Sequence, residues 1–248
     1  MPLVEPGPQL TSDEVARHVR TIAVAGIGDL GLRRLRAARV FVVGAGGLGS
    51  PALTYLVGAG VGHVTIIDND VVELHNLQRQ VLHDTAGVGR RKVDSAADRL
   101  RALDPSVSLT LLTDRLGPET AAGFLAGHDL VLDCTDNVET RYAIADAAAA
   151  LDLPVVWGAI SGYAGQLTVF HASRGYGLRD LWPTAPSPTA ITDVGAYGPV
   201  IGAVGALMAS EAVKLLTGAG RPLLGRVLFV DAMAGTTAEI PLAVGFRS

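Results

Sequence analysis

The sequence predicts an α/β fold in which helices cover both faces of a mainly parallel β-sheet. Three observations support this prediction. Short apolar runs, typical of buried strands, alternate with longer helix-like stretches. The first run, at 40–43, leads into a glycine-rich turn and then a helix-like segment, as in doubly wound, Rossmann-like folds. Two of the runs end in acidic residues, at Asp68 and Asp133, where each strand would reach the edge of the sheet.

Local signals place the individual elements. Cap-forming and acidic residues open a helix near 12–20, whereas residues 1–10, rich in proline and glycine, should form an arm that orders on docking or a frayed end. We expect strands at 40–43, 62–70, 107–113, 130–132, 154–160 and 165–171, and a terminal pair within 225–233 and 236–244. We expect helices at 51–60, 91–103, 118–126, 138–151 and 199–217.

The second half of the chain departs from strict strand–helix alternation. Only a short glycine-containing stretch separates the strands at 154–160 and 165–171, so we expect an antiparallel hairpin there. With the terminal pair, it should extend the parallel sheet by antiparallel C-terminal strands. Residues 172–198 contain several prolines and no clear period, which indicates a long loop that is functional or mobile. We see no internal repeat and no interdomain linker.

Composition excludes several classes of protein. The net charge of −4, without a basic block, argues against a nucleic-acid partner. A single cysteine excludes an intrachain disulfide and any cysteine-cluster metal site. The longest uncharged run, at 194–210, is short for a membrane span and favours a buried helix, so no membrane partner is expected. The N-terminus shows no secretory signal, and we expect a cytoplasmic location.

The turn at 44–49 fits the pattern G-x-G-x-x-G and stands between a strand and a helix, the context in which it binds phosphate. Its glycines are Gly44, Gly46, Gly47 and Gly49. Asp68 ends the next strand, about 20 residues on, and is well placed for a ribose hydroxyl. These features support any adenine nucleotide, NAD included, and a strand–helix turn without a ligand remains an alternative.

Four polar residues follow the nucleotide strands and argue against NAD: Asn76, Arg79, Lys92 and Asp136. A dinucleotide needs one pyrophosphate cradle, whereas additional cations suit a triphosphate, which carries more charge. Ligands of doubly wound sheets bind outside the carboxyl ends of the strands, where these residues should meet.

The chain resembles the MoeB/ThiF adenylyltransferases, relatives of the ubiquitin-activating enzymes. The matching stretches, in family order, are "RHVR", "VVGAGGLG", "IIDND", "NLQRQ", "VGRRK", "LDCTDN" and "GPVIGAVGALMASEAVKLLTG". The resemblance implies that 1–248 form one adenylyltransferase domain, with a helical arm at 1–38, a nucleotide-binding part at 39–137, a crossover loop at 172–198 and a helix with strands at 199–248. It also implies an enzyme that uses ATP and Mg²⁺ to activate the C-terminal glycine of a ubiquitin-like sulfur-carrier protein, for thiamin or molybdopterin synthesis.

The resemblance assigns a role to each candidate residue. The 44–49 backbone, Asn76, Arg79 and Lys92 would hold the phosphates, and Asp68 the ribose. Asp136 would bind Mg²⁺, while Asp133 and Asn137 would shape the strand end or cap the following helix. Arg20 would reach the nucleotide of a neighbouring subunit, so a homodimer is implied. Cys134 is expected to be an inert core thiol.

Two departures from the family concern cysteine. The two C-x-x-C pairs that bind structural zinc in many members are missing, so no structural zinc is expected. A further cysteine that takes up the acyl group in some members is also missing, which implies either release of the adenylate to an external sulfur donor or a divergent paralogue with another substrate. Other hypotheses remain: adenylation of a peptide or other carboxylate, an NAD(P) oxidoreductase, or a nucleotide-binding scaffold without turnover.

Overall fold

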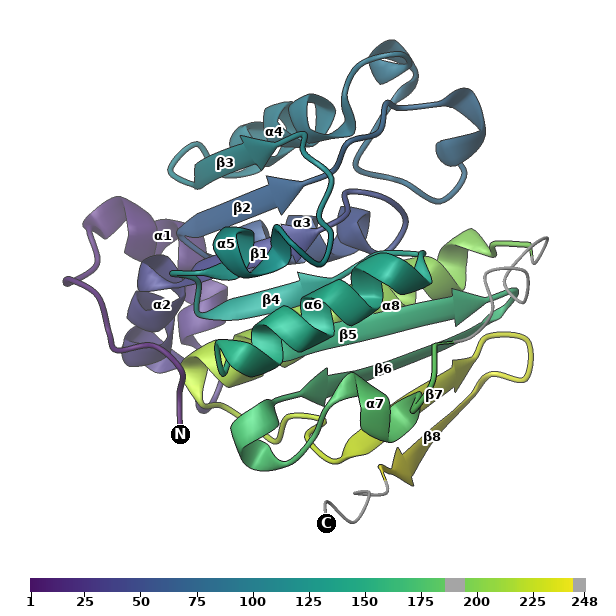
Figure 1. Ribbon diagram of the computed structural model, residues 1–248. Helices are drawn as coiled ribbons and strands as arrows, with labels where there is room; N and C mark the ends of the chain where they lie inside the picture. The colour runs from purple at the N-terminus through teal and green to yellow at the C-terminus, as the bar shows by residue number, and fades with distance from the viewer. Residues whose placement is uncertain (186–194, 243–248) are drawn as a thin grey trace.

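The structure is a computed structural model that describes residues 1–185 and 195–242, and this part of the chain forms one eight-stranded sheet (Figure 1). The strands are β1 (Arg39–Val43), β2 (His63–Ile67), β3 (Ser108–Leu112), β4 (Leu130–Asp133), β5 (Val155–Ser161), β6 (Ala164–Phe170), β7 (Arg226–Asp231) and β8 (Thr236–Pro241). The helices are α1 (Ser12–Ile22), α2 (Gly28–Ala37), α3 (Gly49–Ala59), α4 (Lys92–Leu103), α5 (Ala121–Leu125), α6 (Val138–Ala150), α7 (Leu178–Leu181) and α8 (Gly198–Thr217). Short 3₁₀ turns lie at η1 (Leu74–Asn76), η2 (Thr85–Gly87) and η3 (Ala172–Arg174).

The strand order is β3-β2-β1-β4-β5-β6-β7-β8, and it confirms the predicted fold class. Strands β1 to β5 pair in parallel, whereas β5-β6, β6-β7 and β7-β8 pair antiparallel. The chain leaves β1 toward β2 and later returns to pair β4 with the other side of β1. The sheet therefore has a switch point between β1 and β4, where the connections that follow the two strands diverge and leave room for a ligand.

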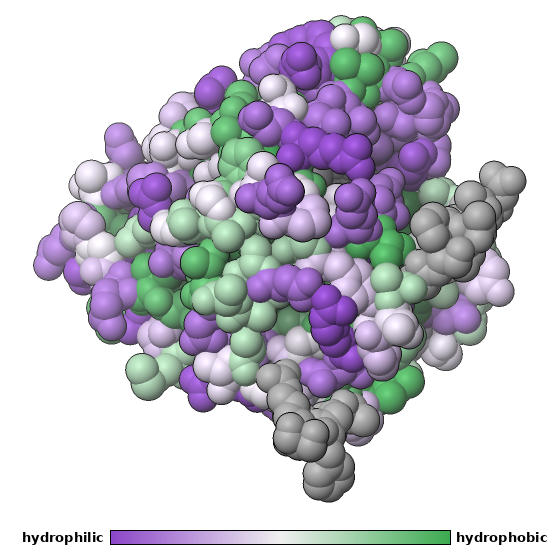
Figure 2. Space-filling view, in the orientation of Figure 1, coloured by the Kyte–Doolittle hydropathy of each residue, from purple (hydrophilic) through white to green (hydrophobic). Residues whose placement is uncertain are grey.

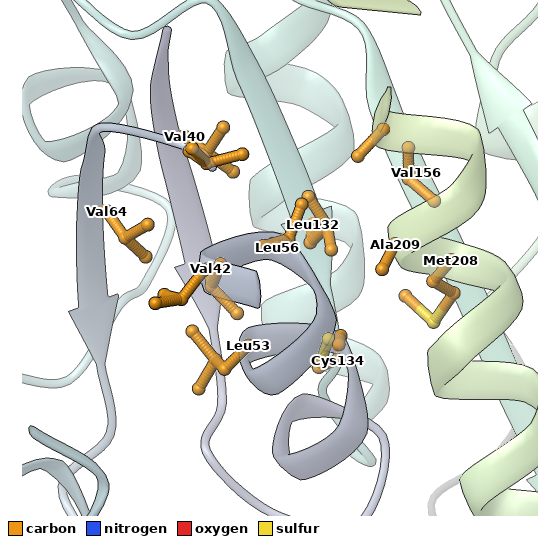
Figure 3. Packing of buried hydrophobic residues seen from close by; sticks show 14 of the residues in the cluster. Val40, Val42, Leu53, Leu56, Val64, Leu132, Cys134, Val156, Met208 and Ala209 are labelled. Carbon is orange, nitrogen blue, oxygen red and sulfur yellow. The ribbon is translucent and has the colours of Figure 1, made fainter. Parts of the chain in front are cut away.

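Both faces of the sheet are covered, which explains why the strands read as continuous apolar runs. Val40 and Val42 of β1 belong to one core cluster, and Phe41 and Val43 to the other, because successive side chains point to opposite faces. Helices α2, α3, α4 and α8 cover the first face, and α5 and α6 cover the second (Figure 1). Figure 3 shows residues of the first cluster: Val64, Leu132 and Val156 from the strands pack against Leu53 and Leu56 of α3 and Met208 and Ala209 of α8.

The N-terminal segment decides between two expectations and adds an element. Residues 1–10 form a docked arm and not a frayed end: the Leu3 amide donates to the Leu215 carbonyl of α8, and Arg33 donates to the Gly7 carbonyl. Helix α1 begins with the predicted cap, Thr11. The sequence did not predict α2, although its Leu32 and Leu35 are fully buried against the core.

The loop predicted at 172–198 contains regular structure, because η3 and α7 lie within it, while residues 186–194 lie outside the described residues, as do 243–244 of the predicted last strand. Within the described residues, α8 is the one helix long and apolar enough to cross a membrane, and most of it is buried. It packs against α2, α3, β5 and β6. Figure 2 shows hydrophilic residues over the part that holds β2, β3 and α4, and paler residues over the alanine-rich α6.

Candidate functional site

A cavity of about 1250 Å³ opens at the carboxyl ends of the parallel strands, at the switch point between β1 and β4. Its walls come from segments far apart in the sequence: the turn after β1, the ends of β2 and β4, the start of α4 and α6, the hairpin β5-β6, and residues next to α7 and α8. Among the described residues that line the cavity are these predicted site residues: Gly44, Gly46, Gly47, Asp68, Arg79, Lys92 and Asp136.

The glycine turn has two kinds of glycine. A Cβ at Gly49 would lie 2.0 Å from the Gly44 carbonyl oxygen. Gly44 itself has φ +97°, and a Cβ there would lie 3.0 Å from the Cys134 carbonyl oxygen. These two glycines therefore permit close packing of backbone on backbone. Gly46 and Gly47 also line the cavity, but the nearest atoms to a Cβ at either position belong to side chains. Within the described residues, the N–H groups of Gly46, Gly47 and Leu48 have no hydrogen-bond acceptor, so three donors remain available at the start of α3.

Asp68 is held against this turn. One carboxylate oxygen accepts from the Ala45 amide at 2.8 Å, and the other accepts from the Asp70 amide at 2.9 Å. Each oxygen has a second lone pair, so the carboxylate can still accept from a ligand hydroxyl. The Lys92 ammonium, on the first residue of α4, donates to Asp70 at 2.8 Å, and its side chain is 7% exposed. Lys92 is therefore a buried cation whose partner, Asp70, is itself mostly exposed.

The segment after β2 brings Arg79 to the cavity but not Asn76. Arg79 donates to the His75 carbonyl at 3.2 Å and leaves the rest of its guanidinium free of protein partners within the described chain. Asn76 is buried and is not among the described lining residues; its carbonyl accepts from the amides of Arg79 and Gln80. Gln80, 4% exposed, lines the cavity beside Gly46, and its Oε1 atom has no partner in the described residues.

The turn after β4 separates the two acids that surround Cys134. Asp133 is buried and accepts from both the amide and the hydroxyl of Thr135, at 3.0 and 2.6 Å. Asn137 caps α6 by accepting from the Thr140 amide at 2.9 Å, so the predicted structural roles of Asp133 and Asn137 are confirmed. Asp136 lines the cavity and has no hydrogen bond or ion pair to the described residues. Cys134 is buried, and burial raises the pKa of its thiol, as expected of an inert core cysteine.

Sequence reasoning missed a buried arginine that contacts this turn and lines the cavity. Arg141, 6% exposed, donates to the Thr135 carbonyl and lies over the rings of Trp157 and Trp182, with 5.2 and 5.8 Å to the ring centroids. Burial raises the pKa of the Asp133 carboxyl, and the nearby Arg141 guanidinium opposes that rise. The signal that could have found Arg141 is its spacing of four residues from the Asn137 cap, because that spacing returns a side chain to the start of the helix.

Arg20 and Gly49 are outside the cavity lining in the described part of the chain. Gly49 lies behind the turn, as its contacts show. Arg20 is exposed on α1, whose His18 lies 3.2 Å from a Cβ position at Gly60, just after α3 ends. Because α3 begins at the cavity and runs away from it, α1, which carries Arg20, lies near the amino-terminal ends of the parallel strands and away from the cavity (Figure 1). Within its own chain, Arg20 does not contribute to the cavity.

The fold and the cavity define a doubly wound α/β domain with its open site where such domains bind nucleotides. A model of the ThiF family matches residues 18–244. The chain therefore belongs to the ThiF family, as the sequence motifs indicated.

The relatives agree with this assignment. The probable adenylyltransferase/sulfurtransferase MoeZ of Mycobacterium tuberculosis is 46% identical over 239 residues, which are 94% of this chain and 61% of that protein. The sulfur carrier protein adenylyltransferase of Thermus thermophilus is 44% identical over 238 residues, 93% of this chain and 88% of that protein. This chain thus spans less than two thirds of the mycobacterial relative. A crystal structure of E. coli MccB with MccA-N7isoASN has the same fold, with a TM-score of 0.83 and 16% identity over 95% of this chain and 73% of that chain.

Proposed function

We propose that this protein is an ATP-dependent adenylyltransferase that activates the C-terminal glycine carboxylate of a ubiquitin-like sulfur-carrier protein, for thiamin or molybdopterin synthesis. The observation that carries the proposal is the cavity that joins the free N–H groups of the glycine turn to Arg79, Lys92 and Asp136. The names of the mycobacterial and Thermus relatives support the same reaction.

The nucleotide would lie in the part of the cavity that is lined by the glycine turn and the ends of β2 and β4. The amides of Gly46, Gly47 and Leu48 form a phosphate cradle at the N-terminus of α3, where the helix dipole also favours negative charge. Asp68 would accept a hydrogen bond from a ribose hydroxyl. Arg79 would pair with a phosphate, since most of its guanidinium donors are uncommitted. Asn76 would act indirectly, because its carbonyl holds the turn that presents Arg79.

Lys92 would bind the phosphates by giving up its ion pair with Asp70. The Lys92–Asp70 pair keeps the buried ammonium neutralised before ATP arrives. A triphosphate offers a larger negative charge at the same place, so the cation can move from one partner to the other without being left unpaired.

Asp136 fits a magnesium site. It is a carboxylate that faces the cavity and has uncommitted oxygens within the described structure, and Mg²⁺ is commonly bound by one or two carboxylates together with substrate phosphates. When bound, Mg²⁺ would neutralise phosphate charge and stabilise the departing pyrophosphate. Asp133 cannot share this task in the observed arrangement, since it is buried and bonded to Thr135.

The proposed reaction joins a carboxylate oxygen to the α-phosphorus of ATP and breaks the bond between that phosphorus and the pyrophosphate oxygen. Both reactants are anionic, so the residues must supply positive potential and alignment. Arg79, Lys92 and the cradle amides would do so, and no general base is required because a carboxylate is already ionised at neutral pH. Pyrophosphate leaves and an acyl-adenylate forms.

The carrier tail would occupy the rest of the cavity, between the hairpin β5-β6 and the residues beside α7 and α8. A cavity of about 1250 Å³ exceeds the usual size of a pocket for one small ligand, roughly 300–1000 Å³, and leaves room for an extended peptide end. The acyl-adenylate would pass to an external sulfur donor, because the only cysteine, Cys134, is buried with a raised pKa. Arg20 would complete a neighbouring subunit's site in a homodimer.

ATP–pyrophosphate exchange tests the proposal. Wild-type protein should catalyse exchange only when a carrier with an intact C-terminal glycine and Mg²⁺ are present. Asp136→Ala should reduce exchange by at least ~10²-fold, by analogy with the loss of one transition-state donor. The matched control is Asp98→Ala, which removes an exposed acid paired with Arg90 on the outside of α4 and should leave exchange unchanged. Exchange by Asp136→Ala within about threefold of wild type would refute the role of Asp136.

A further inference from the structure

The Ala45–Gly46 peptide unit of the glycine turn is held by a buried histidine that the proposed reaction does not use. His83 is 6% exposed, and its Nε2 atom lies 2.9 Å from the Ala45 carbonyl oxygen. Its Nδ1 atom lies 3.0 Å from the Ser95 hydroxyl on α4. The amide of the same Ala45 donates to Asp68. Both backbone groups of Ala45 are therefore fixed by side chains from other parts of the chain.

The hydrogen-bond partners define the tautomer of His83. A carbonyl oxygen can only accept, so the proton must be on Nε2, and Nδ1 of the neutral ring accepts from the Ser95 hydroxyl. Burial, together with the nearby Lys92, lowers the pKa of His83, while its bond to Ala45 and the carboxylates of Asp68 and Asp84 act in the opposite direction. The ring is thus held neutral, with its single donor directed at Ala45.

This bond controls the direction of the next amide. The C=O and N–H of one trans peptide unit point in opposite directions, so fixing the Ala45 carbonyl on His83 points the Gly46 amide away from His83. His83 is not among the described cavity-lining residues, whereas Gly46 is. The Gly46 amide is therefore directed to the cavity side, where it has no acceptor within the described residues.

Local geometry alone does not enforce this direction. Gly46 carries no side chain and tolerates many backbone angles, so the Ala45–Gly46 peptide could rotate if nothing held it. A rotated peptide would present a carbonyl oxygen, in place of an N–H, to a bound phosphate. It would also leave the buried Ala45 carbonyl without the partner that a buried backbone group requires.

We propose that His83 is a positioning residue for nucleotide binding: the chain of hydrogen bonds Ser95–His83–Ala45 orients the Gly46 amide toward the phosphates of the ligand. This inference rests on the proposed function, since it assumes that the turn binds the phosphates of ATP. It adds His83 and Ser95 to the residues that determine affinity, although neither touches the ligand.

The test compares the affinities of two ligands, ATP and adenosine, by isothermal titration calorimetry. His83→Ala should weaken ATP binding by about tenfold, the effect of one lost hydrogen-bonding group, and leave adenosine binding unchanged. His83→Gln, whose amide can replace the Nε2 donor, should retain ATP affinity within about threefold. Ser95→Ala removes the hydrogen bond that fixes the tautomer of His83 but keeps the ring, so the loss of ATP affinity should be smaller than in His83→Ala.

A second histidine provides the matched control. His128 bonds Thr65 and the Leu125 carbonyl, remote from the cavity lining, so His128→Ala should reduce stability and leave affinity for ATP unchanged. If His83→Ala does not fold, the Gln and Ser95 variants decide. Equal losses for ATP and adenosine, or ATP affinity like wild type in His83→Ala and Ser95→Ala, would overturn the inference. Failure of the wild-type protein to bind ATP would instead refute the proposed function and the inference with it.

Discussion

Replacing Gly49 by alanine should destabilise the protein far more than the same change at Gly46, three residues earlier in the same turn. At Gly49 the new methyl would lie 2.0 Å from the Gly44 carbonyl oxygen and 2.9 Å from its carbon. An ordinary carbon–oxygen contact is at least about 3.3 Å, so the backbones must separate by more than about 1 Å. Gly44 follows β1 and Gly49 starts α3, and both elements are deeply buried.

The size of the effect follows from that overlap. Overpacking in a core typically costs about 1–3 kcal/mol, and contact with backbone, which cannot rotate away, places Gly49→Ala at about 3 kcal/mol or more. For a domain of this size the melting temperature should fall by roughly 6–12 °C. At Gly46 the nearest atom to a new methyl is Gln80 Nε2 at 3.5 Å, an ordinary contact, so stability should change by less than about 1 kcal/mol.

Thermal denaturation and ATP titration of the two variants separate packing from binding. Gly46→Ala should keep the wild-type melting temperature but bind ATP more weakly, because its methyl occupies the wall of the cavity beside the cradle amides. A melting temperature for Gly49→Ala within about 2 °C of wild type would refute the close approach of α3 to β1. Unchanged ATP affinity in Gly46→Ala would refute the placement of the phosphates.

The remaining predictions concern pH, Arg141 and the neighbouring subunit. Desolvation lowers the pKa of three histidines, which are His18, His83 and His128. Below about pH 6.5, the ordinary histidine pKa, the unfolded chain therefore binds more protons than the folded chain, and stability should fall as the pH drops from about 7.5 to about 5. In urea denaturation, His128→Gln should lose less stability over this range than the wild type. An equal loss would contradict this account. Arg141→Lys should lower the free energy of unfolding by about 2 kcal/mol, because it weakens the hydrogen bond to the Thr135 carbonyl. It should also shift the tryptophan fluorescence, because the chain's two tryptophans both contact Arg141. Unchanged stability and an unchanged spectrum would argue against this stacking. Mixing inactive Arg20→Ala with inactive Asp136→Ala should restore some exchange activity, and no recovery despite demonstrated subunit exchange would contradict a residue shared between subunits.

The sequence predicted those parts of the site that depend on topology. Asp68 and Asp136 end or follow parallel strands, and the carboxyl ends of such strands meet at one edge, so both acids reach the cavity as expected. The cap at Asn137 and the burial of Cys134 also follow from local rules. Arg79 follows β2 and Lys92 begins α4, so the sequence also predicted that both residues would lie near the cavity.

Tertiary contacts account for what the sequence did not reveal. His83 acts on Ala45, 38 residues away, and nothing in the residues between them indicates that the ring is turned toward the glycine turn. Asn76 has the polarity of a ligand-binding residue, yet the 3₁₀ turn at Leu74–Asn76 directs it into the protein and away from the described lining. Helix α2 was missed because arginines dominate its surface, although its two buried leucines hold it on the core.

The docked start of the crossover segment likewise depends on contacts that sequence patterns do not show. Tyr142 of α6 donates to the Trp182 carbonyl at 2.6 Å, and Arg179 pairs with Asp146 at 2.8 Å. Leu178 is buried in the same core cluster as Leu242, near the C-terminal end of the described chain. One apolar cluster thus includes residues from both the start of the crossover segment and the end of the described chain.

The most direct test of the central claim is to detect the acyl-adenylate itself. Wild-type protein is incubated with ATP, Mg²⁺ and a candidate sulfur carrier, and the carrier is examined by mass spectrometry under acidic quench. The account predicts a carrier heavier by one adenylyl group, with the modification at its C-terminal glycine and with stoichiometric release of pyrophosphate; a carrier without the terminal glycine should remain unmodified. Tight ATP binding without adenylylation or pyrophosphate release for any carrier tested, or binding of NAD in place of ATP, would contradict it.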